Sequence, residues 1–250
     1  MTRKIALIPV YNEESTLLPV LQSVAPRVDL LVLVDDGSSD SSLKLAVEFA
    51  RGERKVEVLR LAKNCGMSAA LREGFRHLIS RLHARDLDPA DILLTLDADG
   101  QHDSSEIDDL CRHLEAGGLD VSLTRRDFAL YPLHKRIGNR LMTLWGSILG
   151  GHRYRDVESG FRAMRLKVLP DLLAFYAGHR YSCAQEIAIL TARLGFRVDN
   201  DFLTVIRLYR SQTGARDVFL NAGLGFTAFA RWALGRKVAE RPVLARRVTR

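Results

Sequence analysis

The sequence predicts an α/β fold: a doubly wound, mostly parallel sheet flanked by helices, followed by a C-terminal amphipathic and basic helical extension. Three observations support this prediction. Strand-like apolar runs alternate with helical patterns through the first half of the chain, which is typical of a parallel sheet. Several of these runs are almost continuously apolar, as expected when helices cover both faces of the sheet. Polar clusters follow the runs at their carboxyl ends.

The predicted elements follow one another in a regular order. Five segments have the composition of strands, at residues 4–10, 30–36, 56–62, 91–99 and 120–124. The clearest helix lies between the third and fourth strands, and its apolar face is formed by Leu71, Phe75, Leu78 and Leu82. Asp103 and Glu106 occupy the N-cap and N3 positions expected of a helix after the fourth strand.

Length and composition are those of a globular protein with one large α/β domain or two small ones. Three scattered cysteines form no CxxC pair, and the start of the chain has no signal-peptide pattern, so a reducing cytoplasm is expected. The last twenty residues contain seven basic residues and one acid, and they account for six of the seven net positive charges. A nucleic-acid-binding domain more often spreads basic residues over a folded face, so no nucleic-acid partner is expected.

Four polar clusters follow the first four strands in turn. They are PVYNEES, DDGSSD, KNCG and DADGQHD. In a sheet of this kind ligands bind beyond the carboxyl ends of the strands, so the clusters predict a single site.

The second cluster combines a turn with two acids. A turn and a helix cap explain Gly37 through Asp40. They do not require Asp35 and Asp36, and a carboxylate at a strand end suits a base N–H or a ribose hydroxyl. The chain lacks GxGxxG after the first strand and has no GxxxxGK[ST], which disfavours an NAD enzyme or a P-loop ATPase.

The fourth cluster places Asp97 and Asp99 on one face of the predicted strand. Carboxylates this close need a compensating cation or donor. Mg²⁺ or Mn²⁺ takes oxygen ligands and typically bridges carboxylates to phosphate oxygens, and Gln101 or His102 could complete such a set. The structural alternative is a surface Asp-Gly turn.

Together the motifs resemble the family 2 glycosyltransferases, which have a GT-A nucleotide-sugar fold. The segments PVYNEE, DDGSSD, NCGMSAALREG, DADGQH and SGFR occur in the family's order and approximate spacing. The resemblance covers about residues 4–216, and within the family it is strongest to dolichyl- or polyprenyl-phosphate sugar synthases. One departure is LTRR, residues 123–126, where relatives often have Gly-Ser-Arg.

The resemblance implies a role for each motif residue. The donor's nucleoside would be held by Pro9, Tyr11, Glu13, Asp36 and Asp97. A Mg²⁺ or Mn²⁺ ion bridging the diphosphate would be bound by Asp99 and Gln101. The phosphates of donor and acceptor would lie near Ser159, Arg162, Arg210 and Arg216. Glu186 falls where many relatives place an acid near the acceptor, and the expected catalytic set is Asp99, Arg162, Glu186 and Arg210.

The function implied is an inverting, metal-dependent transfer of a sugar from a nucleotide-sugar donor to a polyprenyl phosphate, a step of cell-envelope glycan biosynthesis. A lipid phosphate is already anionic and would need arginines rather than a base. Three alternatives stay open. They are transfer to a saccharide hydroxyl with Glu186 as general base, a nucleotidyltransferase, and a nucleotide-sugar-binding or membrane-scaffolding protein without turnover.

Residues 1–216 are expected to form the GT-A domain and residues 217–250 the extension. The apolar segment 218–230 is shorter than the roughly 20 residues that span a bilayer. It is either a buried helix or an interfacial helix that places Phe219, Phe226, Phe229 and Trp232 at the headgroups. The interfacial alternative predicts a peripheral enzyme at the inner face of the plasma membrane.

Overall fold

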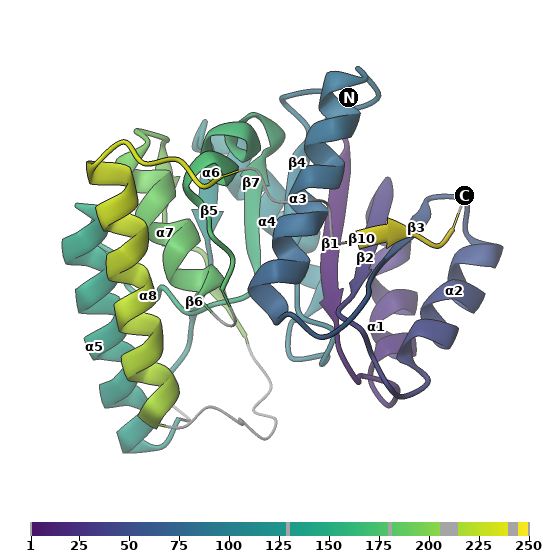
Figure 1. The fold of residues 1–250 in the computed structure, drawn as a ribbon, viewed down its shortest axis with the longest axis horizontal. Coiled ribbons are helices and arrows are strands. Elements are labelled where there is room, and N and C mark those ends of the chain that lie inside the picture. Colours follow the sequence, from purple (N-terminus) through teal and green to yellow (C-terminus); the bar gives the residue numbers. More distant parts are fainter. Residues whose placement is uncertain (1, 129–130, 180–181, 206–214, 240–244, 250) are drawn as a thin grey trace.

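A computed structural model describes residues 2–249 apart from 129–130, 180–181, 206–214 and 240–244, and of residues 215–219 it describes the backbone alone. A central sheet runs through the molecule with helices on both faces (Figure 1). Helices α5, Leu133–Gly150, and α8, Ala215–Ala233, stand side by side at the end of the molecule far from α2, Ser42–Gly52.

The main sheet has eight strands in the order β10-β3-β2-β1-β4-β7-β5-β8. Four neighbours at its centre run parallel: β3, Val56–Leu61, β2, Leu30–Asp35, β1, Lys4–Val10, and β4, Ile92–Thr95. Strand β7, Arg162–Arg165, runs antiparallel between β4 and β5, Val121–Leu123. The outer strands are β8, Val198–Asp199, and β10, Ala245–Arg247, while β6, Arg125–Arg126, pairs with β9, Leu203–Thr204.

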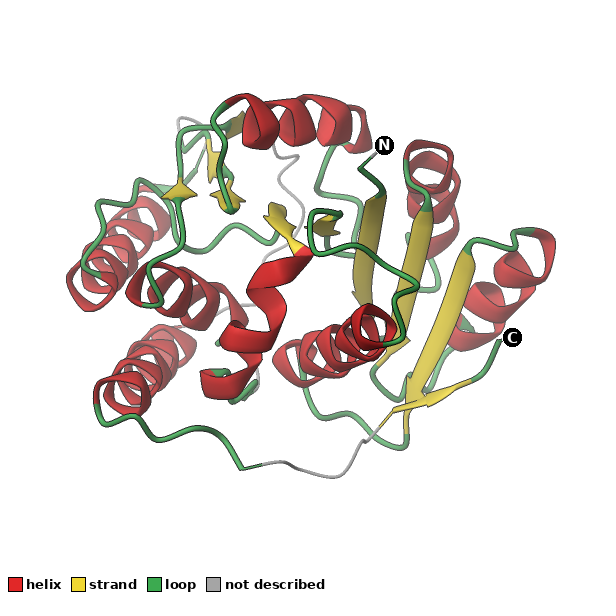
Figure 2. Cartoon of the chain, turned by 90° about the horizontal axis from the view of Figure 1, so that it is seen from above, coloured by secondary structure: helices red, strands yellow, loops and turns green. Residues whose placement is uncertain are grey.

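Two apolar cores lie on opposite faces of this sheet. Helices flank the strands on both sides (Figure 2). Alternate residues of β1 divide between the two cores, since Ile5 and Leu7 enter one core and Ala6 and Ile8 the other. The first core is covered by α3, Met67–His83, α6, Leu169–Phe175, and α7, Cys183–Arg193. The second is covered by α1, Leu17–Val24, α2, and α4, Ile107–Ala116. Burial on both faces explains why β1 and β2 read as continuous apolar runs.

The structure confirms the doubly wound, mostly parallel sheet and the five predicted strands, with one correction at the fourth. Strand β4 ends at Thr95, so Asp97 and Asp99 lie on the loop after it and not on a strand face. The Asp103 side chain caps the short 3₁₀ turn Ser104–Glu106 by accepting a hydrogen bond from the Ser105 N–H. Glu106 stands at N3, but its carboxylate binds Thr204 and Val205 instead of completing a capping box.

The C-terminal region is part of the same body. Helix α8 packs on α5 and α7 with Ala228 fully buried, and β10 extends the sheet beside β3. The expected boundary between residues 216 and 217 therefore falls inside α8. Phe229 and Trp232 pack on the guanidinium of Arg193, whereas Phe226 is half exposed. Across the described residues, no helix combines the length and hydropathy needed to cross a bilayer.

Candidate active site at the carboxyl edge of the sheet

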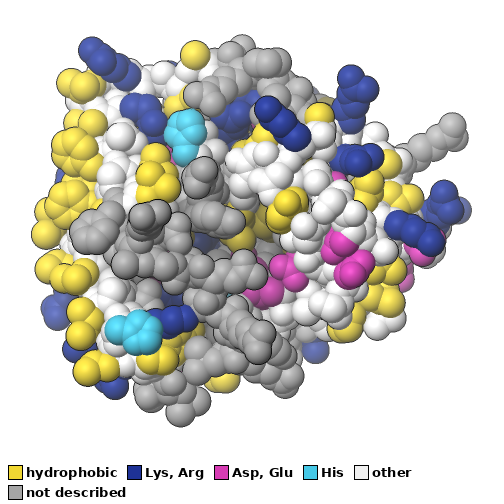
Figure 3. Space-filling model, turned by 60° about the horizontal axis from the view of Figure 1, so that its bottom comes forward, with side chains coloured by type: hydrophobic (Ala, Val, Ile, Leu, Met, Phe, Trp, Pro, Cys, Tyr) yellow, Lys and Arg dark blue, Asp and Glu magenta, His cyan; other side chains and the backbone are white. Residues whose placement is uncertain are grey.

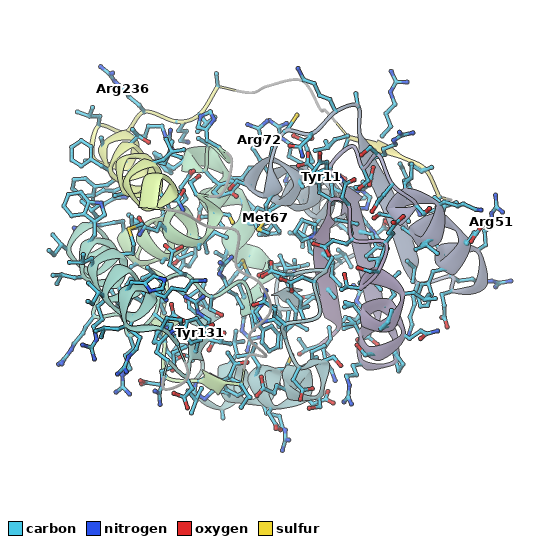
Figure 4. All side chains as sticks on the ribbon, turned by 90° about the horizontal axis from the view of Figure 1, so that it is seen from below. Tyr11, Arg51, Met67, Arg72, Tyr131 and Arg236 are labelled. Atoms are coloured by element: carbon cyan, nitrogen blue, oxygen red, sulfur yellow. The ribbon has the colours of Figure 1, made fainter. Side chains whose placement is uncertain are left out.

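The four polar clusters meet at one edge of the sheet, where the parallel strands end. The antiparallel direction of β7 brings a fifth cluster to the same edge, because its first residue, Arg162, pairs with Thr95 at the end of β4. Acidic side chains gather near the middle of the face that contains this edge (Figure 3). Tyr11 and Met67 lie toward the centre of the same face, and Arg51 and Arg236 mark its opposite rims (Figure 4).

Asp36 organises the loops around the expected nucleoside site. Its buried carboxylate accepts hydrogen bonds of 2.7 Å from the backbone N–H groups of Cys65 and Gly66, at the start of α3. Gly37 has φ +70°, and a Cβ there would lie 2.6 Å from the backbone of Lys63. Only glycine lets the two loops approach this closely. Asp36 thus has both oxygens engaged with backbone in this arrangement.

The loop after β1 presents a mixed surface. Pro9 is buried within β1, Tyr11 is exposed, and the carboxylate of the partly buried Glu13 accepts a 2.8 Å hydrogen bond from Thr16. Asn12 ties this loop to the next, because its side-chain oxygen accepts a 2.9 Å bond from the Ser39 N–H. The exposed ring of Tyr11, next to a loop held by these hydrogen bonds, offers a surface on which a planar base can stack.

Three acids face one another across this edge. Burial raises the pKa of Asp99, and the charge of Asp97 raises it further. Burial also raises the pKa of Glu13, and the charges of Asp99 and Asp97 add to it. Neighbouring acids therefore add to the effect of burial on both Glu13 and Asp99, as expected where carboxylates lie close together.

Asp97 is held on the inner side of the loop. Its carboxylate is 3.1 Å from Nε2 of His102, and the His102 ring stacks on Phe161. Burial alone would raise the pKa of Asp97, but the His102 hydrogen bond and the charges of Arg162 and Arg126 lower it below its usual value. A Cβ on Gly160 would lie 2.3 Å from this carboxylate, so the SGFR motif needs glycine where it crosses Asp97.

Arg162 is a buried cation with no bonded anion. Its side chain is 2% exposed, yet it forms no hydrogen bond or ion pair with any residue that the structure describes. Ser159, three residues earlier in the same motif, is buried, and its hydroxyl lies 2.7 Å from the Thr124 hydroxyl. The charge of Arg162 acts to lower the pKa values of Asp97 and Glu158, but the guanidinium has no described hydrogen-bond acceptor, so it is a donor that a ligand anion could use.

The donor set at the edge fits a divalent cation shared with a phosphorylated ligand. Among the described residues there is no group of three or more His, Cys, Asp or Glu side chains arranged to hold a metal on their own. Asp99 and Gln101 are two residues apart, and the Asp99 carboxylate accepts hydrogen bonds from the backbone N–H and from the side-chain amide of Gln101. One or two protein oxygens completed by ligand phosphates is the usual arrangement for Mg²⁺.

A second ion pair supports the site, and sequence reasoning missed half of it. Arg126 binds Asp156 through Nε at 2.7 Å and through a terminal nitrogen at 2.9 Å. Of the two arginines in LTRR it is therefore Arg126 that points inward, whereas Arg125 donates a hydrogen bond to the Asp201 carbonyl at the surface. Glu158 lies nearby with a pKa raised by burial, and its Oε1 has no partner among the described residues. Asp156 and Glu158 lie within three residues before SGFR, and this closeness to the motif is the one signal that could have marked them.

Glu186 is placed differently from what a general base requires. It is 1% exposed, and it accepts hydrogen bonds from the Ala177 N–H at 2.8 Å and from the Ser182 hydroxyl. Arg231 of α8 lies 3.3 Å from the same carboxylate. Both oxygens therefore hold α7, the loop before it and α8 together, and neither is presented to a ligand.

Two predicted residues lie beyond what the structure resolves in detail. Arg210 lies outside the described residues, and Arg216 is in the first turn of α8 but its side chain is not described. Of the others, the structure brings Tyr11, Glu13, Asp97, Asp99, Gln101, Ser159 and Arg162 to one edge of the sheet.

Comparison with known proteins adds three findings. The sequence profile described as glycosyl transferase family 2 matches residues 5–187. The UDP-N-acetylglucosamine–dolichyl-phosphate N-acetylglucosaminyltransferase of Methanococcus voltae is 26% identical, over 90% of this chain and 92% of the relative. The undecaprenyl-phosphate mannosyltransferase of Micrococcus luteus is 28% identical, over 78% of this chain and 80% of the relative.

Solved structures share the fold. Glucosyl-3-phosphoglycerate synthase from Mycobacterium tuberculosis, crystallised with Mn²⁺ and uridine-diphosphate-glucose, superposes with a TM-score of 0.64 at 20% identity. The match covers all of this chain and 86% of that one. At this level of identity the likeness shows the fold alone, an α/β architecture of the GT-A type.

Proposed function

The chain belongs to glycosyl transferase family 2, and from this membership we propose that it moves a sugar from a nucleotide-sugar donor to a polyprenyl phosphate, with inversion at the anomeric carbon. Mg²⁺ or Mn²⁺ would be bound between Asp99, Gln101 and the donor's diphosphate. Both named relatives act on lipid phosphates of this kind, and the chain covers most of their length.

One juxtaposition carries the proposal. At the same edge of the sheet burial and neighbouring acids raise the pKa values of Asp99 and Glu13, and the buried guanidinium of Arg162 is bonded to no residue that the structure describes. A divalent ion with a diphosphate satisfies both at once, since the ion neutralises Asp99 while phosphate oxygens reach Arg162.

The reaction would be a single displacement. A phosphate oxygen of the acceptor attacks the anomeric carbon, the bond from that carbon to the diphosphate breaks, and the nucleoside diphosphate leaves with the electron pair. The bound cation would stabilise charge on the leaving diphosphate. Arg162 would hold phosphate oxygens, Asp97 and His102 would fix the loop that carries Asp99, and Tyr11 with Glu13 would contact the nucleoside.

The hydrogen bonds and the ion pair of the Glu186 carboxylate favour a phosphate acceptor over a saccharide hydroxyl. A hydroxyl acceptor must lose a proton, so it needs a base with a free oxygen within reach. Both oxygens of Glu186 are bonded to protein groups. A phosphate acceptor needs no such base. We place the reaction at the inner face of the plasma membrane, where the lipid phosphate and a cytoplasmic donor would meet.

The test follows a labelled sugar from the donor to its acceptor. The protein is screened against nucleotide sugars with Mn²⁺ for thermal stabilisation, and the stabilising donor is then supplied with labelled sugar and polyprenyl phosphate. We expect label in an organic-extractable lipid, released nucleoside diphosphate in equal amount, and loss of both on chelation. Label found only in water-soluble saccharide would overturn the acceptor assignment, and donor binding without turnover on either acceptor would indicate a binding protein.

A further inference from the structure

We propose that the exposed face of α5 is the surface by which this protein docks on an anionic lipid bilayer. This inference rests on the proposed function, because a lipid acceptor gives the protein a reason to bind a membrane. The experiment that tests membrane binding does not depend on the transferase activity.

Helix α5 has two opposite apolar faces. Met142, Gly146 and Leu149 point into the protein and are buried. On the other side a stripe of five large aliphatic residues is 49–69% exposed: Leu133, Ile137, Leu141, Leu144 and Ile148. Their spacing of four, four, three and four residues keeps them on one face over about 22 Å of helix.

The stripe is not a scatter of single exposed side chains. Apolar residues form a column down the side of the molecule where α5 and α8 stand (Figure 3). The neighbouring helix α8 adds the exposed Leu220 and Phe226. A continuous apolar surface of this length on a folded protein indicates a partner.

The charge of α5 selects the partner. The helix contains Lys135, Arg136 and Arg140 and no acidic residue. Arg140 is exposed beside the stripe, and Arg236 and Lys237 are exposed beyond the end of α8. A basic amphipathic helix with an aliphatic face suits an anionic membrane surface. A second copy of the chain would bring two positively charged helices together, which is unfavourable.

The stripe is also linked to the active site. Asn139, on α5 among the stripe residues, accepts a 3.4 Å hydrogen bond from Arg126, and Arg126 holds Asp156. If α5 lay in the headgroup layer, the contact between Asn139 and Arg126 would connect it directly to the residues that border the site. This is where a lipid phosphate, whose tail stays in the bilayer, must arrive.

The docking surface differs from the C-terminal segment that sequence patterns suggested. In α8, Phe229 and Trp232 pack against Arg193 and only part of the helix is exposed. The stripe on α5 was missed because its aliphatic residues share the helix with an equally apolar buried face, so the pattern reads as an ordinary core helix.

The experiment measures binding of the full chain to vesicles of phosphatidylcholine with and without phosphatidylglycerol. The test variant is Leu141→Ser with Leu144→Ser, and the control is Leu18→Ser, an exposed leucine on α1. Both positions are exposed, so thermal midpoints should stay close to that of the unmodified protein. We expect binding that needs phosphatidylglycerol, that falls about tenfold or more in the stripe variant, and that is unchanged in the control.

Two results would overturn the docking proposal. One is vesicle binding that the stripe variant leaves unchanged. The other is an unmodified protein that is dimeric by light scattering and becomes monomeric in the stripe variant, since the face would then belong to a second copy. Transfer to detergent-solubilised polyprenyl phosphate separates the two proposals. The stripe variant should retain that activity, whereas its absence in the unmodified protein would contradict the proposed function and leave the vesicle result standing.

Discussion

Two arginines at the site have opposite environments, and the contrast defines what each does. Arg126 has a bidentate partner in the fully buried Asp156, so its charge is compensated within the protein. Arg162 is more deeply buried than Arg126, but it is bonded to no described residue. Arg126 therefore forms an ion pair within the protein, and we propose that Arg162 binds a phosphate of the ligand.

Arg162→Gln separates these roles. We expect kcat/KM to fall roughly 10²–10³-fold, because a charge that stabilises developing phosphate charge is lost. The thermal midpoint should change by no more than about 3 °C, because the guanidinium is bonded to no described residue and Asp97 keeps its hydrogen bond to His102. Turnover assays and calorimetric unfolding of one preparation measure both quantities.

Arg126→Gln is the matched control. It leaves the buried Asp156 without its cation, which should lower the free energy of unfolding by about 3–5 kcal/mol. If instead Arg162→Gln proved the more destabilising substitution and left turnover intact, the phosphate role of Arg162 would have to be abandoned.

At the scale of elements, Glu186 joins α7, the loop before it and α8. Removing the side chain in Glu186→Ala leaves Arg231 and the Ala177 N–H without their acceptor, and we expect the free energy of unfolding in urea to fall by about 3 kcal/mol. In Glu186→Gln the amide oxygen can still accept from Ala177, so most of the turnover per folded molecule should remain. A stable glutamine variant without turnover would instead support Glu186 as a general base.

The edge strand β10 is attached through Glu57 of β3. Its carboxylate is 2.6 Å from Nε2 of His77 and 3.0 Å from nitrogens of Arg81 and of Arg247 in β10. Burial on its own would raise the pKa of Glu57, but the His77 hydrogen bond and the charges of Arg81 and Arg247 outweigh it and lower the pKa below the ordinary 4.5.

This lowered pKa fixes the direction of a pH effect. A carboxyl with a depressed folded-state pKa stabilises the protein fully above pH 4.5, and that contribution is lost as the pH falls through the lower folded value. Glu57→Gln should therefore be less stable than the unmodified protein at pH 7, and the difference should narrow below pH 4.5. Urea midpoints at several pH values measure it. A difference that stayed constant down to pH 3 would count against the Glu57 cluster as the anchor of β10.

For the whole molecule, sequence patterns predicted the longer strands in the first half of the chain, whose apolar residues mostly follow one another directly. Continuous apolar runs marked β1 and β2 almost to the residue, because burial on both faces leaves no polar position before the strand ends. Strand β3 was also located, although Glu57 and Arg60 interrupt its apolar run. The short strands β6 to β10 hold two to four residues each, too few for a period to show. Strand β4 was extended wrongly to Asp99 because polar loop residues continue the alternation of a strand.

Candidate site residues could be identified from the sequence where they belong to one short motif. Contacts between residues far apart in the sequence could not be identified in this way. The motifs DADGQH and SGFR were each identified from their own residues. They meet at one edge of the sheet because β7, which begins at the last residue of SGFR, runs antiparallel to β4. The pairing of Arg126 with Asp156 and of Glu186 with Arg231 joins residues 30 and 45 positions apart, and no local pattern reports such contacts.

The central claim is that Asp99 and its neighbours tolerate one another because a divalent ion carrying a diphosphate joins them. The most direct measurement is the thermal midpoint of the unmodified protein and of Asp99→Asn with nucleoside diphosphate and Mn²⁺, each alone and both together. In the unmodified protein the two ligands together should raise the midpoint by more than the sum of their separate effects. Asp99→Asn should fold but lose that excess, whereas an equal excess in the variant, or stabilisation indifferent to Mn²⁺, would contradict the claim.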